Sequence, residues 1–273
     1  MRFASFLISI AIAGIVSSAG PAGATGFCFD PHSFFSVSSP GDSTTAVIVI
    51  RHSECDLGAR QASLLTGDLL LRRGPRYEFL IEQQFPAVRD REGIRYGVGD
   101  MLLRATARIT GDSADVSGLF LRADARIPTG TPALRPFSDA LFEAEGGLEA
   151  RFATRGFDVR AAALYTLVPA ERRTADFAND AHYTLAASAG AGVAAAARVD
   201  VSAFLLGYDG GETRHLFAGS IGRGLSPQLR FDLAAAAESG DAGSRVFETS
   251  VSASLTYRFP PGKPAPGADS SQP

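Results

Sequence analysis

The residues that could support chemistry are few and scattered. The four histidines, His32, His52, His182 and His215, lie far apart and lack the spacing of metal ligands. The sequence contains no G-x-S-x-G or other nucleophile motif. Residues 219–224 are rich in glycine, but they fall at a short turn between two expected strands with no helix to follow, so they do not indicate a phosphate cradle.

Two polar clusters remain as candidates for catalysis. One surrounds His52 and the other precedes His182; their other members are Ser53, Glu54 and Asp56 in the first and Asp176 and Asp180 in the second. Either cluster has residue types that transfer protons, but charged residues in loops are usually only solvated. We therefore predict that the protein is not an enzyme and has no catalytic residues, no metal site and no cofactor.

A larger set of charged residues recurs at every second position within long segments. At this spacing they share one face of a strand, where opposite charges attract across neighbouring strands. Arg suits such ladders because its planar guanidinium binds carboxylates through paired hydrogen bonds. These side chains form a narrow polar path or only brace the wall, and the sequence leaves both open. The predicted lumen-lining residues are Arg104, Arg108, Arg122, Asp124, Arg126, Glu143, Glu145, Glu149, Arg151, Asp158, Arg160, Arg230 and Asp232.

The segments that carry these residues have the period of β-strands, with apolar and polar residues in alternation. Most are about ten residues long or longer, which suits a transmembrane strand of about 9–11 residues better than a soluble strand of about 5–6. Twelve segments qualify: 44–51, 64–72, 76–85, 99–110, 117–127, 141–153, 157–168, 181–192, 197–207, 214–222, 227–238 and 245–259.

The connections between these segments indicate a membrane barrel. Outer-membrane barrels have an even number of strands, short periplasmic turns and longer outer loops. With the last strand ending in the periplasm, we expect outer loops at 51–64, 85–99, 128–141, 168–181, 207–214 and 238–245, and turns at 72–76, 110–117, 153–157, 192–197 and 222–227. We therefore predict an all-β fold, a transmembrane antiparallel up-and-down β-barrel of about twelve strands over residues 44–259.

Composition and the N-terminus agree with export to a membrane. The chain is 45% hydrophobic and 20% charged with a net charge of −3, which argues against disorder and against nucleic-acid binding. Arg2, the apolar run 6–16 and Ala22-Gly23-Ala24 are typical of a cleaved signal peptide over 1–24. We predict an outer-membrane location, an N-terminal periplasmic or plug segment over 25–43, and a flexible Pro/Gly/Ser-rich tail over 260–273.

The two cysteines raise a question of topology. An oxidising compartment permits a Cys28–Cys55 disulfide. The predicted barrel, however, puts Cys28 on the periplasmic side and Cys55 in the first outer loop, whereas the Cα atoms of a disulfide lie within about 7 Å of each other. Either residues 25–43 thread into the lumen as a plug, or 44–51 is not a full spanning strand, or the bond does not form.

The last strand looks like an assembly signal. Its outward face ends in Phe, as in the terminal strands that the outer-membrane assembly machinery recognises. The residues concerned are Val251, Ala253, Leu255, Tyr257 and Phe259. Residues 260–273 follow them, which departs from a strictly C-terminal signal.

Two short motifs add a family resemblance. They are a G-x-G-D strand start and an R-x-P-T-G strand end, formed by Gly97, Gly99, Asp100, Arg126, Pro128, Thr129 and Gly130. Together with the final Tyr-x-Phe, they resemble the outer-membrane barrel family labelled "MetA-pathway of phenol degradation" over about residues 64–259. The resemblance implies a transporter-like barrel for aromatic or other small hydrophobic compounds, in which these motifs are structural.

Three functions are compatible with these predictions. The leading hypothesis is an outer-membrane channel or transporter-like barrel for passive passage of small, hydrophobic or aromatic molecules. The alternative is a structural or interaction protein with a closed, salt-bridged lumen and partner-binding loops such as 85–99 and 168–181. The third is an enzyme with a site at the barrel rim near His52 or His182. The expected partners are outer-membrane lipid and lipopolysaccharide, the assembly machinery and an unidentified small solute, with no nucleic acid.

Overall fold

The computed structural model describes residues 34–35, 44–56, 61–74, 76–111, 117–130, 134, 142–154, 156–167, 183–194, 196–207, 213–240 and 249–259. They form the strands β1 (Thr44–Asp56), β2 (Gln61–Arg73), β3 (Tyr77–Asp90), β4 (Gly93–Tyr96), β5 (Met101–Thr110), β6 (Gly118–Ile127), β7 (Glu143–Thr154), β8 (Phe157–Leu167), β9 (Tyr183–Ala194), β10 (Ala197–Gly207), β11 (Thr213–Gly224), β12 (Leu229–Gly240) and β13 (Thr249–Arg258). The predicted segments 1–24 and 260–273, and all of 25–43 except Phe34 and Phe35, lie outside the described residues.

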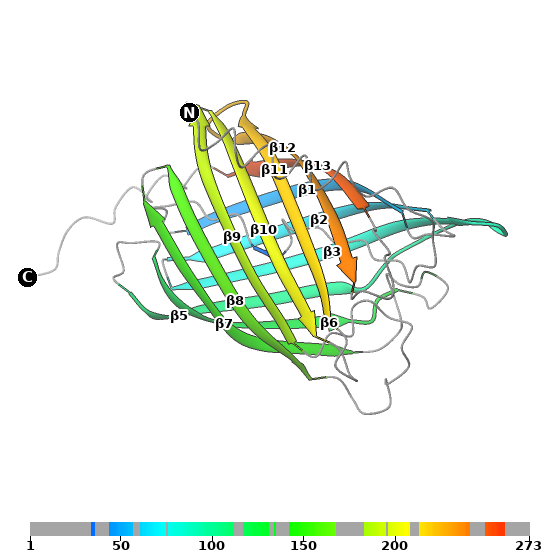
Figure 1. Cartoon of the computed structure of the whole chain (residues 1–273), viewed down its shortest axis with the longest axis horizontal. Helices are drawn as coiled ribbons and strands as arrows, with labels where there is room; N and C mark the ends of the chain where they lie inside the picture. The colour runs from blue at the N-terminus through cyan, green and yellow to red at the C-terminus, as the bar shows by residue number, and fades with distance from the viewer. Residues whose placement is uncertain are drawn as a thin grey trace, which may run out of the picture.

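All of these strands except β4 close into an antiparallel barrel (Figure 1). Strands that are adjacent in the sequence pair with each other from β5 to β13, and β1 joins β13 to β2. The sheet closes because β2 pairs with β3, which pairs with β5. The predicted all-β, up-and-down barrel of about twelve strands is confirmed.

The alternation in the sequence becomes the two faces of the wall. Along most of β2, exposed and buried residues alternate. Outward positions carry large apolar side chains that are more than half exposed, such as Ile50, Phe217 and Val251. Inward positions carry buried polar side chains, such as Arg122 and Thr256, each 1% exposed. Within the described ranges, no helix is both long enough and apolar enough to cross a membrane.

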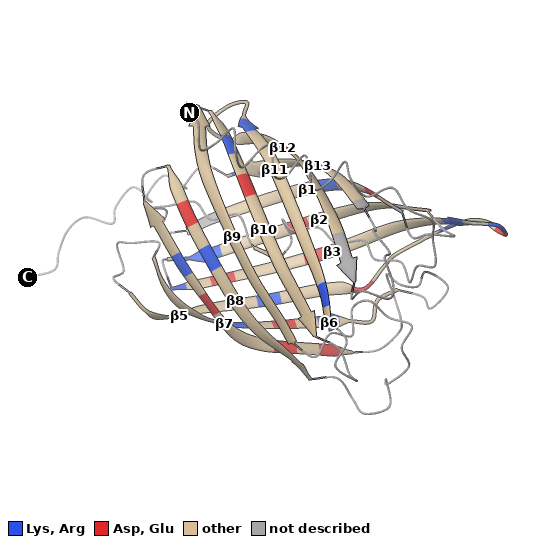
Figure 2. Cartoon of the chain, in the orientation of Figure 1, with Lys and Arg blue, Asp and Glu red and all other residues tan. Residues whose placement is uncertain are grey.

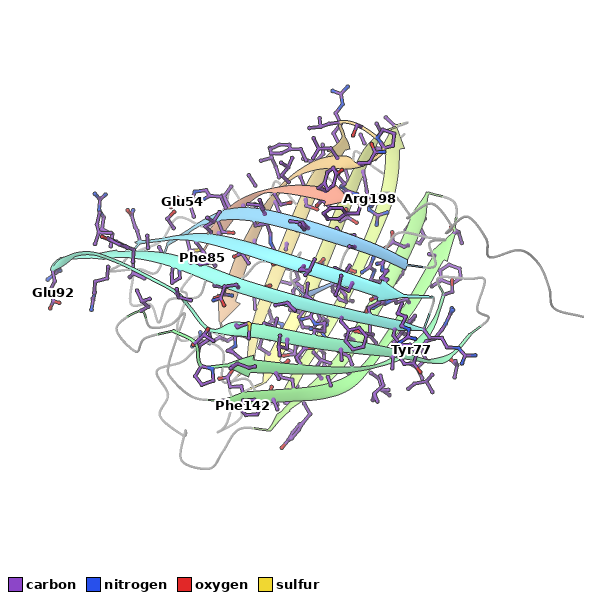
Figure 3. The ribbon with its side chains drawn as sticks, turned by 180° about the vertical axis from the view of Figure 1, so that it is seen from behind. Glu54, Tyr77, Phe85, Glu92, Phe142 and Arg198 are labelled. Atoms are coloured by element: carbon purple, nitrogen blue, oxygen red, sulfur yellow. The ribbon has the colours of Figure 1, made fainter. Side chains whose placement is uncertain are left out.

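Aromatic side chains gather at two levels of the outer face. One level holds Tyr77, Phe152, Phe157, Phe231, Tyr257 and Phe259, and the other holds Phe85, Phe142, Tyr165, Tyr183 and Phe217. Figure 3 shows Tyr77 toward one end of the barrel and Phe85 and Phe142 toward the other. Along β3, the strand rise of about 3.3 Å and a tilt of about 45° place Phe85 roughly 20 Å above Tyr77. These belts are spaced like the aromatic girdles of membrane barrels, although the chain has no Trp.

The two ends of the barrel differ in their connections. We call one the turn end, with connections 74–76, 111–117, 155–156, 195–196 and 225–228, and the other the loop end, with 57–60, 91–100, 128–142, 168–182, 208–212 and 241–248. The connections 128–142 and 168–182 exceed every connection at the turn end, as predicted. The predicted first loop, 51–64, is wrong, because β1 and β2 stay paired as far as Asp56 and Gln61. The connections 57–60 and 208–212 are shorter than 111–117, so the length rule fails for them.

The region predicted as an outer loop at 85–99 is instead a paired hairpin. β3 continues to Asp90, turns at 91–92 and returns as β4, where Gly93 has a positive φ of 137°. With β1 and β2, this hairpin forms a ribbon that extends beyond the rest of the barrel (Figure 1). The prediction failed because loop-type residues, Arg89 to Gly93, mark only the tip of the ribbon.

Candidate functional site

Two arginines from neighbouring strands share one carboxylate inside the barrel. Arg104 on β5 donates to both oxygens of Asp124 on β6 at 2.8–3.0 Å, and Arg122 donates to the same oxygens at 2.7–3.3 Å. The three side chains are at most 5% exposed. A buried charge is costly unless it is paired, so these groups stabilise one another.

The ion pairs continue along the wall from β6 back to β2. Arg122 lies 3.9 Å from Glu149, and Arg151 contacts Glu149 at 2.7 Å and Glu78 at 2.8 Å. Arg72 reaches Glu78 at 2.9 Å. On β1–β3, Arg51 forms buried ion pairs with Asp68 and Glu82. We call all of these residues together the wall network. Its members are Arg51, Asp68, Arg72, Glu78, Glu82, Arg104, Arg122, Asp124, Glu149 and Arg151.

A second chain of charges crosses β8, β10 and β12 near the turn end. We call it the turn-end ladder: Arg160, Asp158, Arg198, Asp200, Arg230 and Asp232. Arg198 pairs with Asp158 on one side and with Asp200 at 2.6 Å on the other. Figure 2 shows charged segments of both signs on the strands of the barrel.

Glycines on the intervening strands make room for this ladder. Gly190 on β9 lies between Asp158 and Asp200 in the strand register, and Gly222 on β11 lies between Arg198 and Asp232. A Cβ at Gly190 would collide with Arg198 and Asp200, and one at Gly222 would collide with Asp232 and Arg230. The missing side chains therefore let each guanidinium lie across a strand to reach the next carboxylate.

The N-terminal segment enters the lumen at Phe34. Its carbonyl oxygen accepts hydrogen bonds from Arg104 at 3.0 Å and Arg122 at 2.8 Å. The Arg122 guanidinium lies 4.3 Å from the Phe34 ring centroid, and the Phe204 ring on β10 packs edge-on at 5.1 Å. Phe34 thus bridges the β5–β6 wall and β10, and part of the predicted segment 25–43 occupies the lumen.

An apolar patch on the inner wall receives these aromatic rings. Phe34 and Phe35 belong to one buried cluster with Ala162, Leu164, Ala186, Phe204, Leu206 and Leu216 from β8–β11. Apolar residues on the inner face of a barrel are otherwise unfavourable toward water. Phe34 and Phe35 therefore shield this patch from water.

A cavity of about 240 Å³ lies in the lumen below Phe35, toward the turn end. Its lining combines the turn-end ladder with an apolar cluster of Val47, Val49, Leu70 and Leu80. Four of the six ladder side chains stay partly exposed, among them Arg198 at 27% and Arg230 at 21%, whereas Arg160 and Asp232 are buried. The lumen is therefore divided into a crowded middle and an open vestibule.

The structure places each predicted lumen residue at an inward position of its strand. Most belong to the wall network or the ladder. Of the others, Arg126 pairs with Glu143 at 3.2 Å, and the Arg108 guanidinium lies 5.6 Å from the Phe120 ring centroid. Glu145 is half-buried and has no ion pair with any described residue.

Sequence reasoning missed the charged residues of β1–β3 and the aromatic pair Phe34–Phe35. Thr66, Asp68 and Arg72 share an inward face in β2, and Glu78 and Glu82 do so in β3. Their even spacing was the available signal, but apolar residues such as Leu70 and Leu80 also occupy that face. For Phe34 and Phe35 the sequence offered no periodicity.

The two family motifs meet in space. Thr129 Oγ1 donates to the Gly99 carbonyl oxygen at 2.8 Å, and the Asp100 carboxylate, 2% exposed, accepts from the Gly130 N–H at 3.1 Å. Gly97 packs closely against Leu134, and a Cβ at position 97 would lie 2.9 Å from the Leu134 Cδ1 atom. Pro128 directly follows the end of β6. These residues fasten the start of β5 to the end of β6.

The cysteine and histidine predictions have mixed outcomes. Cys55 lies within β1 rather than in a loop, is 4% exposed and is disulfide-bonded. The sequence has one other cysteine, Cys28, which lies outside the described residues. His52 faces outward on β1 and contacts Glu54 at 2.9 Å, so the expected rim loop around it does not exist. The second cluster, at 176–182, lies outside the described residues.

The remaining predicted sites lie as follows. Val251, Leu255, Tyr257 and Phe259 point outward from or just after β13, and the Tyr257 and Phe259 rings contact each other edge-on at 5.1 Å. Recognition of this strand by the assembly machinery stays a prediction. Across the described residues, no group of three or more His, Cys, Asp or Glu side chains could hold a metal ion.

Comparisons with known proteins show the fold of this chain. Neither a protein-family model nor a curated protein matches the sequence. Among solved structures, the COG4313 outer membrane channel from Pseudomonas putida F1 is similar with a TM-score of 0.54 and 13% identity, covering 85% of this chain and 100% of that one. The NanC porin gives 0.52 and 9% identity over 77% and 98%, and the KdgM porin gives 0.50 and 11% over 78% and 99%. The chain thus has the β-barrel fold of these outer-membrane proteins.

Proposed function

We propose that the protein is an outer-membrane channel for passive passage of small molecules. The observation that carries this function is the cavity of about 240 Å³ inside the barrel, whose charged lining remains partly exposed. An apolar outer face with two aromatic belts supports a membrane location. The channel-like fold supports the same class of function. The family resemblance adds aromatic or other small hydrophobic compounds as the solute class.

Passage through this channel requires the N-terminal segment to move. Phe34 and Phe35 lie between opposite parts of the wall, held by hydrogen bonds and ring contacts. Such contacts are individually modest, so thermal opening is compatible with them. We therefore assign the narrowest part of the path to these two residues.

Conductance in planar bilayers tests this function. The intact protein should give small or brief currents in potassium chloride, and Phe34→Ala with Phe35→Ala should raise the conductance severalfold. Phe217→Ala is the matched control, because Phe217 points outward and is 58% exposed; it should leave the conductance unchanged. A heat-modifiable gel shift verifies that each variant folds. Absence of current from both the intact protein and the double variant would rule the channel out.

The second candidate is a structural or interaction protein with a closed lumen. The contacts of Phe34 with Arg104 and Arg122 favour it, because they fill the middle of the barrel. The ribbon would then be the contact surface, since Tyr96 is 82% and Ile94 56% exposed at its free strand. Two results together would support this candidate. Neither the intact protein nor the Phe34→Ala with Phe35→Ala variant would give a current, and the protein would bind vesicles containing lipopolysaccharide more tightly than its Tyr96→Ala variant does.

A further inference from the structure

We propose that the cavity at the turn end binds a zwitterion that carries an apolar group, the chemical class of α-amino acids with apolar or aromatic side chains. This inference deepens the proposed channel function, because the cavity lies in the lumen through which a solute would pass. It adds a ligand class that an uncharged aromatic compound would not satisfy.

The cavity has an apolar wall and a charged one. Val47 and Val49 lie on β1, with Leu70 on β2 and Leu80 on β3, and all are at most 7% exposed. The charged wall begins on β8. In the closed order of strands, β1 and β8 are equally far apart in both directions round the barrel. A solute in this cavity therefore meets apolar side chains on β1–β3 and ion pairs from β8 round to β12, which is separated from β1 only by β13.

The ladder itself carries no net charge, and Arg51, Asp68 and Arg151 also line the cavity. The ladder contains three arginines and three aspartates, and opposite charges alternate along it. An anion placed there would meet the aspartates as well as the arginines, and a cation would face the converse problem. A zwitterion carries both charges close together, so its carboxylate can lie beside an arginine while its ammonium group lies beside the adjacent aspartate. Like-charge repulsion then does not offset the attraction of the ligand to the ladder.

The ladder retains hydrogen-bonding capacity on side chains that are partly exposed to the cavity. The contacts of Arg198 and Arg230 with described residues run through Nε and Nη2, which leaves Nη1 of each guanidinium to donate to a carboxylate. The Asp200 Oδ2 atom has an arginine only at 3.7 Å, and the Asp158 Oδ2 atom has one only at 3.6 Å, beyond hydrogen-bond length. These oxygens can accept from an ammonium group.

Exposure separates the two charged regions. Asp200 is 25% and Asp158 is 17% exposed, whereas Arg104 is 5% and Arg122 is 1% exposed. Arg198, labelled in Figure 3, lies at the same end of the barrel as Tyr77. A ligand can reach the ladder from the turn end without breaking the sealed pairs of the wall network.

The size of the cavity limits the ligand. Drug-sized ligands occupy pockets of about 300–1,000 Å³, and this cavity is about 240 Å³. Phe35, Val49 and Leu80 all line the cavity, so a single apolar or aromatic side chain can pack against them. The space therefore suits one amino acid rather than a peptide.

Equilibrium titration of the full-length protein in detergent at neutral pH tests this assignment. The probes share one aryl group or one head group: phenylalanine, 3-phenylpropionate without the ammonium, phenethylamine without the carboxylate, and glycine without the ring. Phenylalanine should bind about tenfold more tightly than each of the others. Equal binding of 3-phenylpropionate or phenethylamine, or no binding of phenylalanine, would overturn the proposal.

Variants locate the binding site. Arg198→Gln and Asp200→Asn should each reduce phenylalanine affinity by about tenfold. The first removes a cationic partner of the ligand's carboxylate, and the second removes an anionic partner of its ammonium group. Glu145→Gln is the control, since Glu145 faces the lumen outside the cavity lining and should bind phenylalanine normally. Affinity that is unchanged in both ladder variants would remove the site from the ladder.

Flux measurements separate this inference from the channel function. Liposomes with the intact protein are assayed with phenylalanine and 3-phenylpropionate. Phenylalanine binding without flux of any solute would retain the site and refute the channel. Flux of both solutes without preferential phenylalanine binding would retain the channel and refute the site.

Discussion

The buried charges of the wall network are paired within strands, between neighbouring strands and, from Arg151 to Glu78, between β7 and β3, and Asp124 is the most connected carboxylate. Two arginines donate to it, and both also donate to the Phe34 carbonyl oxygen. Removing this one carboxylate would leave two guanidinium groups without their main partner inside the protein. An uncompensated buried charge is far more costly than a lost pair at the surface.

We therefore expect Asp124→Ala to lower the free energy of unfolding by about 3–5 kcal/mol. The measurement is urea-induced unfolding of the barrel in detergent or lipid, followed by the heat-modifiable gel shift. Glu145→Ala is the control, because Glu145 is on the next strand, faces inward and has no ion pair among the described residues. Equal losses in the two variants would show that the pairing around Asp124 contributes nothing specific.

At the scale of the strands, the two family motifs act as a fastening between β5 and β6. The Thr129 hydroxyl and the Asp100 carboxylate bond across to Gly99 and Gly130 at the loop end. This contact lies where the chain returns from the ribbon into the wall, since the Gly97 and Gly99 N–H groups still donate to β3 at Pro86 and Gln84. The motifs thus mark where a free hairpin becomes part of a barrel.

Replacing Thr129 tests the fastening. Thr129→Val keeps the shape but loses the hydrogen bond to Gly99, which should cost about 0.5–1.5 kcal/mol of stability. Thr129→Ser retains the hydroxyl and should remain within a few tenths of the parent. Urea midpoints give the global effect, and amide hydrogen exchange at residues 97–103 gives the local one. A Val variant as stable as the parent, together with a weaker Ser variant, would mean that the methyl group, not the hydroxyl, holds this contact.

Strands could be predicted where only one face is apolar. In β13, inward Ser252, Ser254 and Thr256 alternate with outward apolar residues, so that the pattern is visible in the sequence. In β1 both faces are apolar, because inward Val47 and Val49 line the vestibule. Beyond Arg51 the outward positions His52 and Glu54 are polar, so no apolar face continues, which is why the strand was expected to end at Arg51 rather than Asp56.

The apolar patch on the inner wall likewise could not be predicted from the sequence. Phe204 and Leu216 face the lumen because they pack around Phe34 and Phe35, and nothing local in the sequence shows that contact. The ladder, in contrast, follows from spacing, since Arg and Asp two residues apart share the inward face of β10 and of β12. The local sequence pattern therefore predicts the charged ladder of the barrel wall. It does not predict which residues pack inside the lumen, because that packing joins segments far apart in the sequence.

The whole molecule combines a rigid wall with an inserted segment. The wall is continuous, because every barrel strand pairs with two neighbours. The inserted segment touches it at Phe34 through a few non-covalent contacts. Cys55, disulfide-bonded on β1, is buried with Ala62, Leu64 and Val88 toward the loop end. Because Cys28 is the only other cysteine and precedes Phe34 closely in the sequence, we expect the disulfide to anchor the inserted segment.

This anchor should control how often the channel opens, not how wide it opens. A disulfide typically contributes about 2–4 kcal/mol by restricting the free chain, so without it the undocked state gains population by roughly tenfold or more. Cys28→Ser with Cys55→Ser should therefore raise the open fraction in single-channel records, while the current of each opening stays that of the parent. The Phe34→Ala with Phe35→Ala variant should instead raise the current of each opening. Either cysteine variant alone should match the double variant, because one bond is lost in each case. Unchanged gating in all three cysteine variants, with free thiols verified by titration in the single variants, would show that the non-covalent contacts of Phe34 hold the segment by themselves.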